Sequence, residues 1–386
     1  MKRVALLIET SRAYGRDLLV GVRRYISEHE PWSVFVELRD LQSSPPRWLR
    51  HWDGDGILTR SGSRAIIEAV RAAGVPAVEL RTHRPDHPFP VVGIDNEAVG
   101  ESCAEYLAEL GFKNFGVYGL TTEPFFEVRR LSFIKGVKRR GFVCQSLEQS
   151  FLHEKPGEWE RQQAALIKWL QTLPKPAAVL ACTDQLGFWL LDACLRAGIA
   201  VPEEVAVMGV ENDETLCEMS SPPLTSMRLA GEQVGFEAAK LLDRLMKGGK
   251  APKKATLVKP LGIVFRKSTD TVAIDDPLLS AAIRLIREKA SEGLRVKDIL
   301  KHIPLSRSTL ERGFREVLGR SPTAEINRVR LGSARRLLID TEMTLEQIAR
   351  RTGYSSVQYF SHAFRSMFGC TPGSYRKGQG VSDKKT

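Results

Sequence analysis

Phe314-Arg-Glu-Val-Leu-Gly-Arg-Ser-Pro322 and Phe364-Arg-Ser-Met-Phe-Gly-Cys-Thr-Pro372 are two copies of one pattern, F-R-x-x-ϕ-G-x-x-P, in which ϕ is an apolar residue. The copies lie fifty residues apart, and an apolar residue stands four positions before each of the two phenylalanines. Apolar residues at steps of four lie on one face of a helix, so each copy continues a buried helix face. The repeat predicts two equivalent helices whose core residues are Leu310, Phe314 and Leu318, and Phe360, Phe364 and Phe368.

Each of these helices is expected to follow a shorter one. Short helices are predicted over 296–301 and 345–351, followed by the tight turns Ile303-Pro-Leu-Ser306 and Thr352-Gly-Tyr-Ser355. A short helix, a turn and a longer helix form a helix-turn-helix unit. The sequence therefore predicts an all-α tail with two such units, joined by a long helix over 323–339.

The charge of the chain is concentrated in this tail. The 386 residues carry a net charge of +11, and 21 Lys and Arg against 12 Asp and Glu lie in 271–386. Residues 1–270 hold 36 basic and 34 acidic groups, a net charge of only +2. Such an asymmetry indicates a polyanion-binding module joined to a nearly neutral body, although an Arg-rich solvated surface would give the same totals.

The first 270 residues alternate between two kinds of segment. Short apolar segments, such as 4–9, 114–118, 177–181 and 205–210, are separated by amphipathic stretches. This alternation is typical of parallel βαβ units that are buried on both faces. Two series of such units predict two doubly wound α/β lobes, with a ligand cleft where the carboxyl ends of the strands meet.

Polar residues follow four of the predicted strands. They are Thr10, Ser11 and Arg12; Asp95; Thr183 and Asp184; and Glu211. Singly, each is more typical of a helix cap or a turn. Together at successive strand ends they predict a binding cleft for a small, hydroxyl-rich ligand, because hydroxyls donate to carboxylates and accept from arginine.

Several classes of protein are disfavoured. No GxGxxG or GxxxxGK[ST] follows a predicted strand, so the nucleotide fingerprints are missing. Six scattered cysteines form no CxxC pair and no ligand-like spacing with the seven histidines, so we expect no metal and no cofactor. The opening apolar run is too short for a signal peptide, and no run reaches the ~18 residues of a membrane helix. We therefore expect a cytoplasmic protein that contacts no membrane.

Four segments resemble the sugar-contacting segments of LacI-type repressors, whose sensors have the two-lobed periplasmic-binding-protein fold. The segments are Val92-Gly-Ile-Asp-Asn96, Arg129 with Phe133, Cys182-Thr-Asp184 and Met208-Gly-Val-Glu-Asn-Asp213. The resemblance implies a sugar-sensing domain over 1–270, with contacts from Asp95, Arg129, Thr183 or Asp184, and Glu211. The family usually has Asp in place of Glu211. Its N-terminal DNA-binding helices are expected to be missing here, so DNA recognition falls to another part of the chain.

Residues 348–376 closely resemble the signature of AraC-type transcription factors, and the resemblance extends from about 278 to 376. It implies a DNA-binding domain over 275–378 whose two recognition helices enter successive major grooves. Arginine could bind guanine, glutamine adenine and valine a thymine methyl, whereas Arg315 and Arg365 are expected at phosphates. Pro304 stands where the family usually has glycine. The expected DNA contacts are Arg307, Ser308, Glu311, Arg312, Arg315, Ser356, Val357, Gln358, His362 and Arg365.

The order of the two parts is similar to that of the family of bacterial xylose-operon activators, as are Trp169-Leu-Gln-Thr-Leu-Pro174 and Ser306-Arg-Ser-Thr-Leu310. This resemblance implies a sugar-responsive transcription activator with D-xylose as the first candidate effector. Double-stranded DNA, RNA polymerase and a second copy of the chain are the partners it implies. Tyr14, near the first loop, joins the candidate ligand contacts Thr10, Ser11, Arg12, Asp95, Arg129, Thr183, Asp184 and Glu211.

From the residues alone, the inference reaches only a small polar ligand and DNA. A regulator that senses another ligand stays open. An enzyme is a second alternative, in the manner of DNA-repair methyltransferases that carry an AraC-type tail. That activity needs a reactive thiol, and Cys182 at a strand end is the one weak candidate.

Overall fold

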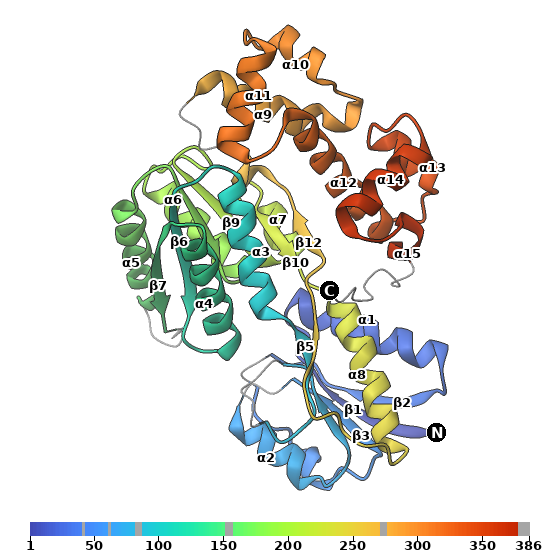
Figure 1. Ribbon diagram of the computed structural model, residues 1–386. Coiled ribbons are helices and arrows are strands. Elements are labelled where there is room, and N and C mark those ends of the chain that lie inside the picture. The colour runs from blue at the N-terminus through green and yellow to red at the C-terminus, as the bar shows by residue number, and fades with distance from the viewer. Residues whose placement is uncertain (41–42, 61–62, 82–86, 151–156, 271–275, 377–386) are drawn as a thin grey trace. The chain divides into compact units, whose positions relative to one another are not determined.

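The computed structural model describes residues 1–40, 43–60, 63–81, 87–150, 157–270 and 276–376 (Figure 1). The chain divides into two compact units, one of residues 1–108 with 112–270 and the other of 271–386 with 109–111. The first is the predicted two-lobed α/β fold and the second is the predicted all-α tail. Asp275 and residues 377–378, at the two predicted ends of the tail, lie outside the described residues.

The first lobe is built on a parallel sheet of strand order β2-β1-β3-β4. Its centre, β1 (Lys2–Leu7), pairs with β2 (Trp32–Val36) on one side and β3 (Gly56–Thr59) on the other, and β4 (Ala77–Glu79) follows β3. Val4 to Ile8 are fully buried, as a strand covered on both faces requires. The helices of this lobe are α1 (Ala13–Glu28), α2 (Arg64–Ala72) and the short 3₁₀ helix η1 (Arg47–His51).

Helix α8 (Gly231–Met246) returns from the second lobe and packs on α1. Gly21 and Gly235 make this contact possible. A Cβ on Gly21 would lie 2.0 Å from the carbonyl oxygen of Glu232, and one on Gly235 would lie 2.0 Å from that of Leu18. The two helices therefore meet backbone to backbone, which fixes α1 and the loop before it at the edge of the cleft.

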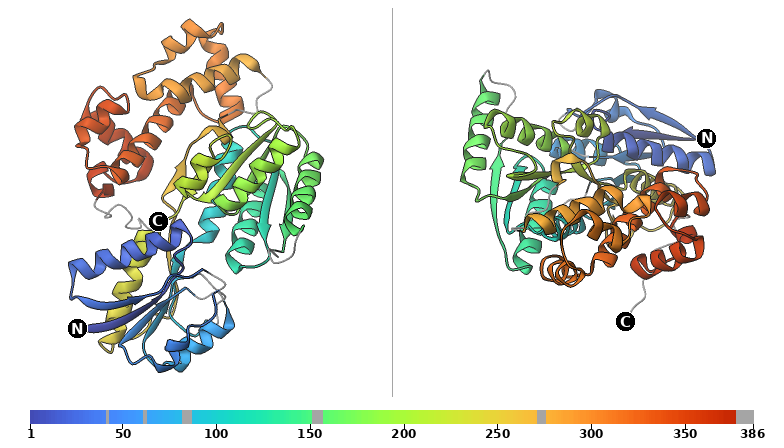
Figure 2. Two further views of the ribbon diagram at one scale, coloured as in Figure 1. Left: turned by 180° about the vertical axis from the view of Figure 1, so that it is seen from behind. Right: turned by 90° about the horizontal axis from the view of Figure 1, so that it is seen from above.

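The second lobe contains a six-stranded sheet of order β12-β10-β9-β8-β6-β7. Its strands pair in parallel except for β12, which is antiparallel to β10, and helices cover both faces (Figure 2). The strands are β6 (Asn114–Leu120), β7 (Val143–Gln149), β8 (Ala177–Ala181), β9 (Val205–Glu211), β10 (Thr225–Arg228) and β12 (Gly262–Val264). The helices are α3 (Asn96–Glu109), α4 (Pro124–Arg139), α5 (Glu158–Thr172), α6 (Asp184–Arg196) and α7 (Glu214–Met219), with the 3₁₀ helix η2 (Lys267–Thr269).

The chain crosses between the lobes three times: at β5 (Val92–Ile94), just before α8, and just after β11 (Thr256–Val258). Strands β5 and β11 pair in parallel, and the amide of Asp95 donates to the carbonyl of Val258, 2.9 Å away. Segments from both lobes thus meet beside the carboxyl ends of β1, β3 and β4, where the sequence predicts the cleft.

The helical unit follows the two repeated patterns. Its helices are α9 (Pro277–Lys289), the 3₁₀ helix η3 (Ala290–Glu292), α10 (Val296–His302), α11 (Arg307–Leu318), α12 (Pro322–Asp340), α13 (Leu345–Arg351), α14 (Val357–Phe368) and α15 (Pro372–Arg376). In each copy of the pattern, the glycine ends the recognition helix at a positive φ, 66° at Gly319 and 75° at Gly369. The proline then opens the next helix, where it loses no hydrogen bond.

The two units have separate cores. Leu310 and Phe314 are buried with the residues of α9 and α10, and Phe360 and Phe364 with those of α12 and α13. Phe368, predicted in the core, is only partly buried. The first turn accommodates Pro304 because it is built without a left-handed residue among those described, whereas the second places Gly353 at φ 80°.

Candidate ligand cleft and DNA interface

A small cavity lies between the lobes of the first unit. It is lined by side chains from α1 and the strand ends of the first lobe, from β5, and from α3 and α4 of the second lobe: Tyr14, Arg60, Leu80, Arg81, Ile94, Asn96, Phe125 and Arg129. Of the predicted ligand contacts, Tyr14 and Arg129 are therefore in its wall. The apolar and aromatic members can cover the ring face of a ligand, and the arginines and Asn96 can bind its polar edge.

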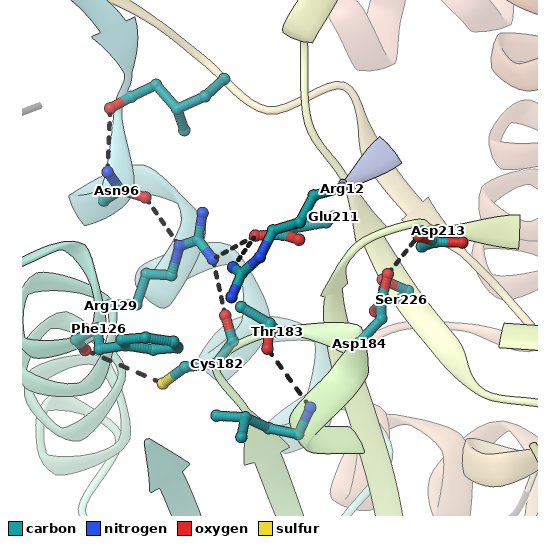
Figure 3. Close-up of polar contacts among 12 residues, drawn as sticks. Arg12, Asn96, Phe126, Arg129, Cys182, Thr183, Asp184, Glu211, Asp213 and Ser226 are labelled. Atoms are coloured by element: carbon teal, nitrogen blue, oxygen red, sulfur yellow. Dashed lines mark hydrogen bonds and ion pairs between the residues drawn. The ribbon is translucent and has the colours of Figure 1, made fainter. Parts of the chain in front are cut away.

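Arg129 is the best-fixed polar group of the cavity (Figure 3). Its Nε donates to Oδ1 of Asn96 at 2.8 Å, and its Nη1 donates to the carbonyl of Cys182 at 2.7 Å. The guanidinium carbon lies 4.7 Å from the ring centre of Phe125. Burial lowers the pKa of Arg129, while the neighbouring Glu211 acts in the opposite direction. Asn96 of α3, the carbonyl that follows β8 and the ring of Phe125 thus hold the guanidinium of Arg129 in a fixed orientation.

Glu211, the last residue of β9, faces Arg129 from the other side, with 3.6 Å between Oε1 and Nη1. Its φ is 114° and that of Asn212 is 58°, values that residues with a Cβ seldom adopt. The amide of Asn212 donates to Oγ of Ser226 at 3.0 Å, which holds this turn in place. Arg12, at the start of α1, approaches the same carboxylate at 4.0 Å.

The first lobe supplies an aromatic and charged wall. Arg60 forms a buried ion pair with Glu9, and its guanidinium carbon lies 5.1 Å from the ring centre of Tyr14. Burial raises the pKa of both Glu9 and Tyr14. Arg81 pairs with Glu123, so an ion pair connects the first lobe to the start of α4 in the second.

Four other predicted contacts are engaged by the protein itself. The hydroxyl of Thr10 accepts from the amide of Arg39 at 3.1 Å, Asp95 accepts from the amide of Ala98 at the start of α3, and Thr183 caps α6. Asp184 accepts from Oγ of Ser226 and from the amide of Asp213, and burial raises its pKa to about 8. Ser11 is exposed. The structure therefore brings Arg12, Tyr14, Arg129 and Glu211 together and gives the others capping or turn-forming partners.

The sequence analysis did not name several charged groups of this wall. They are Glu9, Arg60, Glu79, Arg81 and Glu123. The first four follow or end β1, β3 and β4, so the strand-end argument that found Asp95 and Glu211 would also have found them. With Arg12, Arg129 and Glu211 they form a network of four arginines and four glutamates, in which Arg60, Arg81 and Arg129 line the cavity and the glutamates lie behind them as ion-pair partners. Such a balance suits an uncharged ligand rather than an anion.

In the helical unit, α11 presents the predicted DNA contacts of the first copy. Arg307, Ser308, Arg312 and Arg315 are exposed and Glu311 is half-buried. Nε of Arg307 donates to Oε1 of Glu311 at 3.1 Å, one turn away. Because Leu310, Phe314 and Leu318 hold the opposite face in the core, these polar side chains are left on the outer face of the helix.

Helix α14 has the same arrangement. Gln358, His362 and Arg365 are exposed, Val357 is half-buried, and Ser356 caps the helix by accepting from the amide of Tyr359 at 3.2 Å. Ser306 caps α11 in the same way, at 3.1 Å. Both helices therefore begin with a serine cap and an amino-terminal turn that is open to solvent, the part of a recognition helix that contacts base edges.

Known proteins match the chain along almost its full length. Residues 3–95 match the XylR N-terminal domain, 104–269 a periplasmic binding protein-like domain and 299–378 a helix-turn-helix domain. The xylose operon regulatory protein of Escherichia coli strain K12 is 33% identical over 97% of this chain and 96% of its own length. That of Haemophilus influenzae is 30% identical over 97% and 98%. The chain belongs to the family of xylose operon regulatory proteins.

A solved structure agrees with this membership. The structure of the xylose-binding transcription activator XylR has a TM-score of 0.63 and 31% identity, and the match covers 98% of this chain and 99% of that one. The comparisons confirm the predicted fold class: a periplasmic-binding-protein-like α/β unit before a helical helix-turn-helix domain of AraC type. They also confirm transcription regulation as the function of the family.

The relatives of the chain regulate transcription, which disfavours the enzyme alternative. Cys182 fits this conclusion. Its side chain is fully buried, and burial raises the pKa of its thiol to about 12, so a reactive thiolate is disfavoured. Among the described residues, no cluster of His, Cys, Asp and Glu could hold a metal ion, and no helix is long and apolar enough to cross a membrane.

Proposed function

We propose that this protein is a D-xylose-responsive activator of transcription, with a sensor domain over 1–270 and a DNA-binding domain over 275–378. The observation that carries the proposal is the match, along almost the whole chain, to xylose operon regulatory proteins and to a xylose-binding activator. The protein acts by binding and not by catalysis, in the cytoplasm, where bacterial DNA lies.

The cleft supports an uncharged sugar as the effector. Arg129 and Glu211 present a donor and an acceptor 3.6 Å apart, and Arg12 approaches the same carboxylate from the other lobe. A sugar hydroxyl that lies between such groups can donate to the carboxylate and accept from a guanidinium at once. Glutamates balance the arginines of this network in number, so it carries no net positive charge that would favour a phosphate or a sugar acid.

Sugar binding is proposed to act through lobe closure. Arg12 and Tyr14 come from the first lobe and Arg129 and Glu211 from the second, so a ligand that contacts all four is bound best when the lobes are closed. A ligand shifts a conformational equilibrium toward the state that it binds more tightly. Closure of the sensor is the event that changes DNA binding or contact with RNA polymerase.

A homodimer formed through the sensor is part of the proposal. Strand β2 lies at the open edge of its sheet and exposes Val34, Phe35 and Val36, and Leu38 just beyond it is 87% exposed. The open edge of such a strand, with several exposed apolar residues, is a surface that association would cover. Two DNA-binding domains carried by one dimer would contact two copies of a binding site.

Thermal unfolding of the full chain with a panel of compounds tests the effector. The panel contains D-xylose, its enantiomer L-xylose, L-arabinose, D-ribose, D-gluconate and D-xylose 5-phosphate. A ligand at 100 times its dissociation constant adds about 2.7 kcal/mol of stability, which raises the midpoint by roughly 5–10 °C. A rise with D-xylose alone supports the proposal. A rise with another member replaces the effector, and a rise with an anion contradicts the argument from paired charges.

A further inference from the structure

Helix α12 belongs to the cores of both helix-turn-helix units. Ile326 and Val329 pack with the residues of the first unit, and Leu331 and Leu338 with those of the second. Arg330 lies between these two sets, where one core ends and the other begins. Figure 1 shows α12 passing from the helices of the first copy to those of the second.

The guanidinium of Arg330 turns back to the first unit. Its Nε donates to the carbonyl of Ala290 at 2.8 Å and its Nη2 to the carbonyl of Leu294 at 2.9 Å. Ala290 is the C-cap of α9, so the positive charge meets the carbonyl end of a helix. Only 9% of the surface of Arg330 is exposed, and burial lowers the pKa of its guanidinium. This group is therefore bound by backbone oxygens, unlike the arginines on the surface of α11.

The same guanidinium also contacts the second unit. Its carbon lies 5.6 Å from the ring centre of Tyr354, which is buried in the second core. The preceding Gly353, at φ 80°, is pressed against the first unit. A Cβ there would lie 2.9 Å from the carbonyl oxygens of Ala290 and Ser291 and from the amide nitrogen of Gly293. The turn of the second unit is thus packed against the loop after α9, with Arg330 across the junction.

We propose that Arg330 is a positioning residue that locks the two helix-turn-helix units together, and so sets the distance and the rotation between the DNA segments bound by α11 and α14. The proposal rests on the DNA-binding function proposed above. Because Arg330 is buried, its proposed role does not require contact with DNA. It acts by joining the loop of one unit to the turn of the next.

Rigidity at this junction has a consequence that can be measured. One extra base pair moves two DNA segments apart by roughly 3.4 Å and rotates them by about 35°. Two rigidly joined units cannot adjust to the new distance and rotation, so one of them no longer contacts its DNA segment. Two loosely joined units can adjust, at the cost of a lower affinity for the original DNA, because the second unit is less well placed when the first is bound.

The test uses the full chain and a DNA duplex that the wild-type protein selects from a random pool, with footprinting to locate its two contacted segments. Versions with one or two base pairs inserted or deleted between the segments are compared for the wild type and Arg330→Met. Linked sites contribute about 10²–10⁴ in affinity, so we expect the wild type to lose about 100-fold or more on a one-base-pair insertion. Arg330→Met should lose less than about 10-fold relative to its own uninserted duplex.

Matched variants separate positioning from general destabilisation. Arg284→Met removes an exposed arginine of α9 and should keep the wild-type spacing profile. Gly353→Ala disturbs the same junction from the other side and should broaden the profile as Arg330→Met does. Arg330→Lys keeps the charge and can bind one of the two carbonyls, so it should give a spacing profile between those of the wild type and Arg330→Met. It replaces Arg330→Met in the test if circular dichroism shows that Arg330→Met does not fold.

The possible outcomes are distinct. If the wild-type protein selects no duplex, the proposed DNA-binding function fails. If it selects one but tolerates insertions, the two units are not rigidly joined and the proposal is refuted. If the wild-type profile is sharp and Arg330→Met and Gly353→Ala keep it, the units are held by α12 alone and the role of Arg330 is refuted.

Discussion

Nη1 of Arg12 and Oε1 of Glu211 lie 4.0 Å apart, with Arg12 at the start of α1 in the first lobe and Glu211 at the end of β9 in the second. The separation is too long for a hydrogen bond, and this Nη1 is buried without a hydrogen-bond partner among the described residues. Glu211 also lies 3.6 Å from Nη1 of Arg129. The carboxylate therefore stands between two guanidiniums whose hydrogen-bonding capacity is not used up, a place where a ligand hydroxyl can be bound.

Replacement of Glu211 by glutamine tests this arrangement. Glu211→Gln keeps the size of the side chain but removes the charge, and charged hydrogen bonds contribute about 1.5–3 kcal/mol each. We expect D-xylose affinity, measured by isothermal titration calorimetry, to fall about 10- to 100-fold. Glu148→Gln, which alters a more exposed carboxylate paired with Arg130, is the control and should bind like the wild type. Unchanged affinity of Glu211→Gln would remove this residue from the sugar site.

Arg129 is expected to separate sugar response from DNA binding. In Arg129→Met, the donor to Asn96 and Cys182 is lost and the cleft loses its fixed charge. D-xylose should then no longer raise the unfolding midpoint or activate transcription in vitro, while DNA affinity without sugar stays within about twofold. A loss of DNA binding in parallel, in a variant that folds, would contradict the division of labour between the two units.

The fold was largely predictable because its signals are local. The two copies of F-R-x-x-ϕ-G-x-x-P encode a helix end, a left-handed glycine and a proline start, and Gly319 and Gly369 adopt that conformation. By contrast, no strand is predicted at β7, whose sequence, Val-Cys-Gln-Ser-Leu-Glu-Gln, contains few apolar residues because β7 is an edge strand. None of its seven residues is fully buried, so the composition of β7 resembles that of a loop.

The position of the cleft was predictable from the sequence, but the hydrogen-bond and ion-pair partners of its side chains were not. Strand-end polarity brought Arg12 and Glu211 to one place, whereas Arg129 came only from the resemblance to LacI-type sensors. The strand-end rule cannot tell a ligand contact from a helix cap. Asp95 and Thr183 accept from amides of the helices that follow them, which depends on side-chain rotamers that a sequence does not reveal. The ion pair of Arg81 and Glu123 joins residues of different lobes, and such non-local pairing is invisible to local patterns.

Asp184 predicts a dependence of stability on pH. Burial raises its pKa from an ordinary value near 4 to about 8, so the folded state holds this proton more tightly than the unfolded state. The contribution of the group to stability is full at pH values below about 4, falls as the pH rises, and is lost above about 8. Asp184→Asn mimics the protonated form, since its amide can donate to Ser226 and its oxygen can accept from the amide of Asp213.

Denaturant unfolding between pH 5 and 9 measures this effect. The wild type should become less stable relative to Asp184→Asn as the pH rises through this range. Ser226→Ala leaves the carboxyl but removes a hydrogen bond that lowers its pKa, so in this variant the fall in stability should extend to higher pH than in the wild type. Parallel curves for the wild type and Asp184→Asn would show that the carboxyl does not titrate in this window.

The exposed edge of β2 predicts the oligomeric state. Val36 is 49% exposed on an edge strand that pairs only with β1 among the described residues, and a charge there would oppose association through the open edge. We expect Val36→Glu to sediment as a monomer at concentrations at which the wild type is a dimer, with unchanged thermal unfolding at low protein concentration. Leu131→Glu places the same charge at an equally exposed apolar residue of α4 and should leave the dimer intact. A dimeric Val36→Glu would locate the interface elsewhere.

Arg312 and Arg315 are predicted to act differently, although both are exposed on α11, three residues apart. Arg312 is expected at a base edge, where loss of a bidentate contact costs about 1–3 kcal/mol of discrimination. Arg312→Ala should therefore weaken the selected duplex about 10- to 100-fold and random DNA by much less. Arg315 is expected at a phosphate, so Arg315→Ala should weaken both DNAs equally and reduce the salt slope of log K by about one. Fluorescence anisotropy at several salt concentrations measures both quantities, and equal losses on both DNAs for Arg312→Ala would show that it too contacts only phosphate.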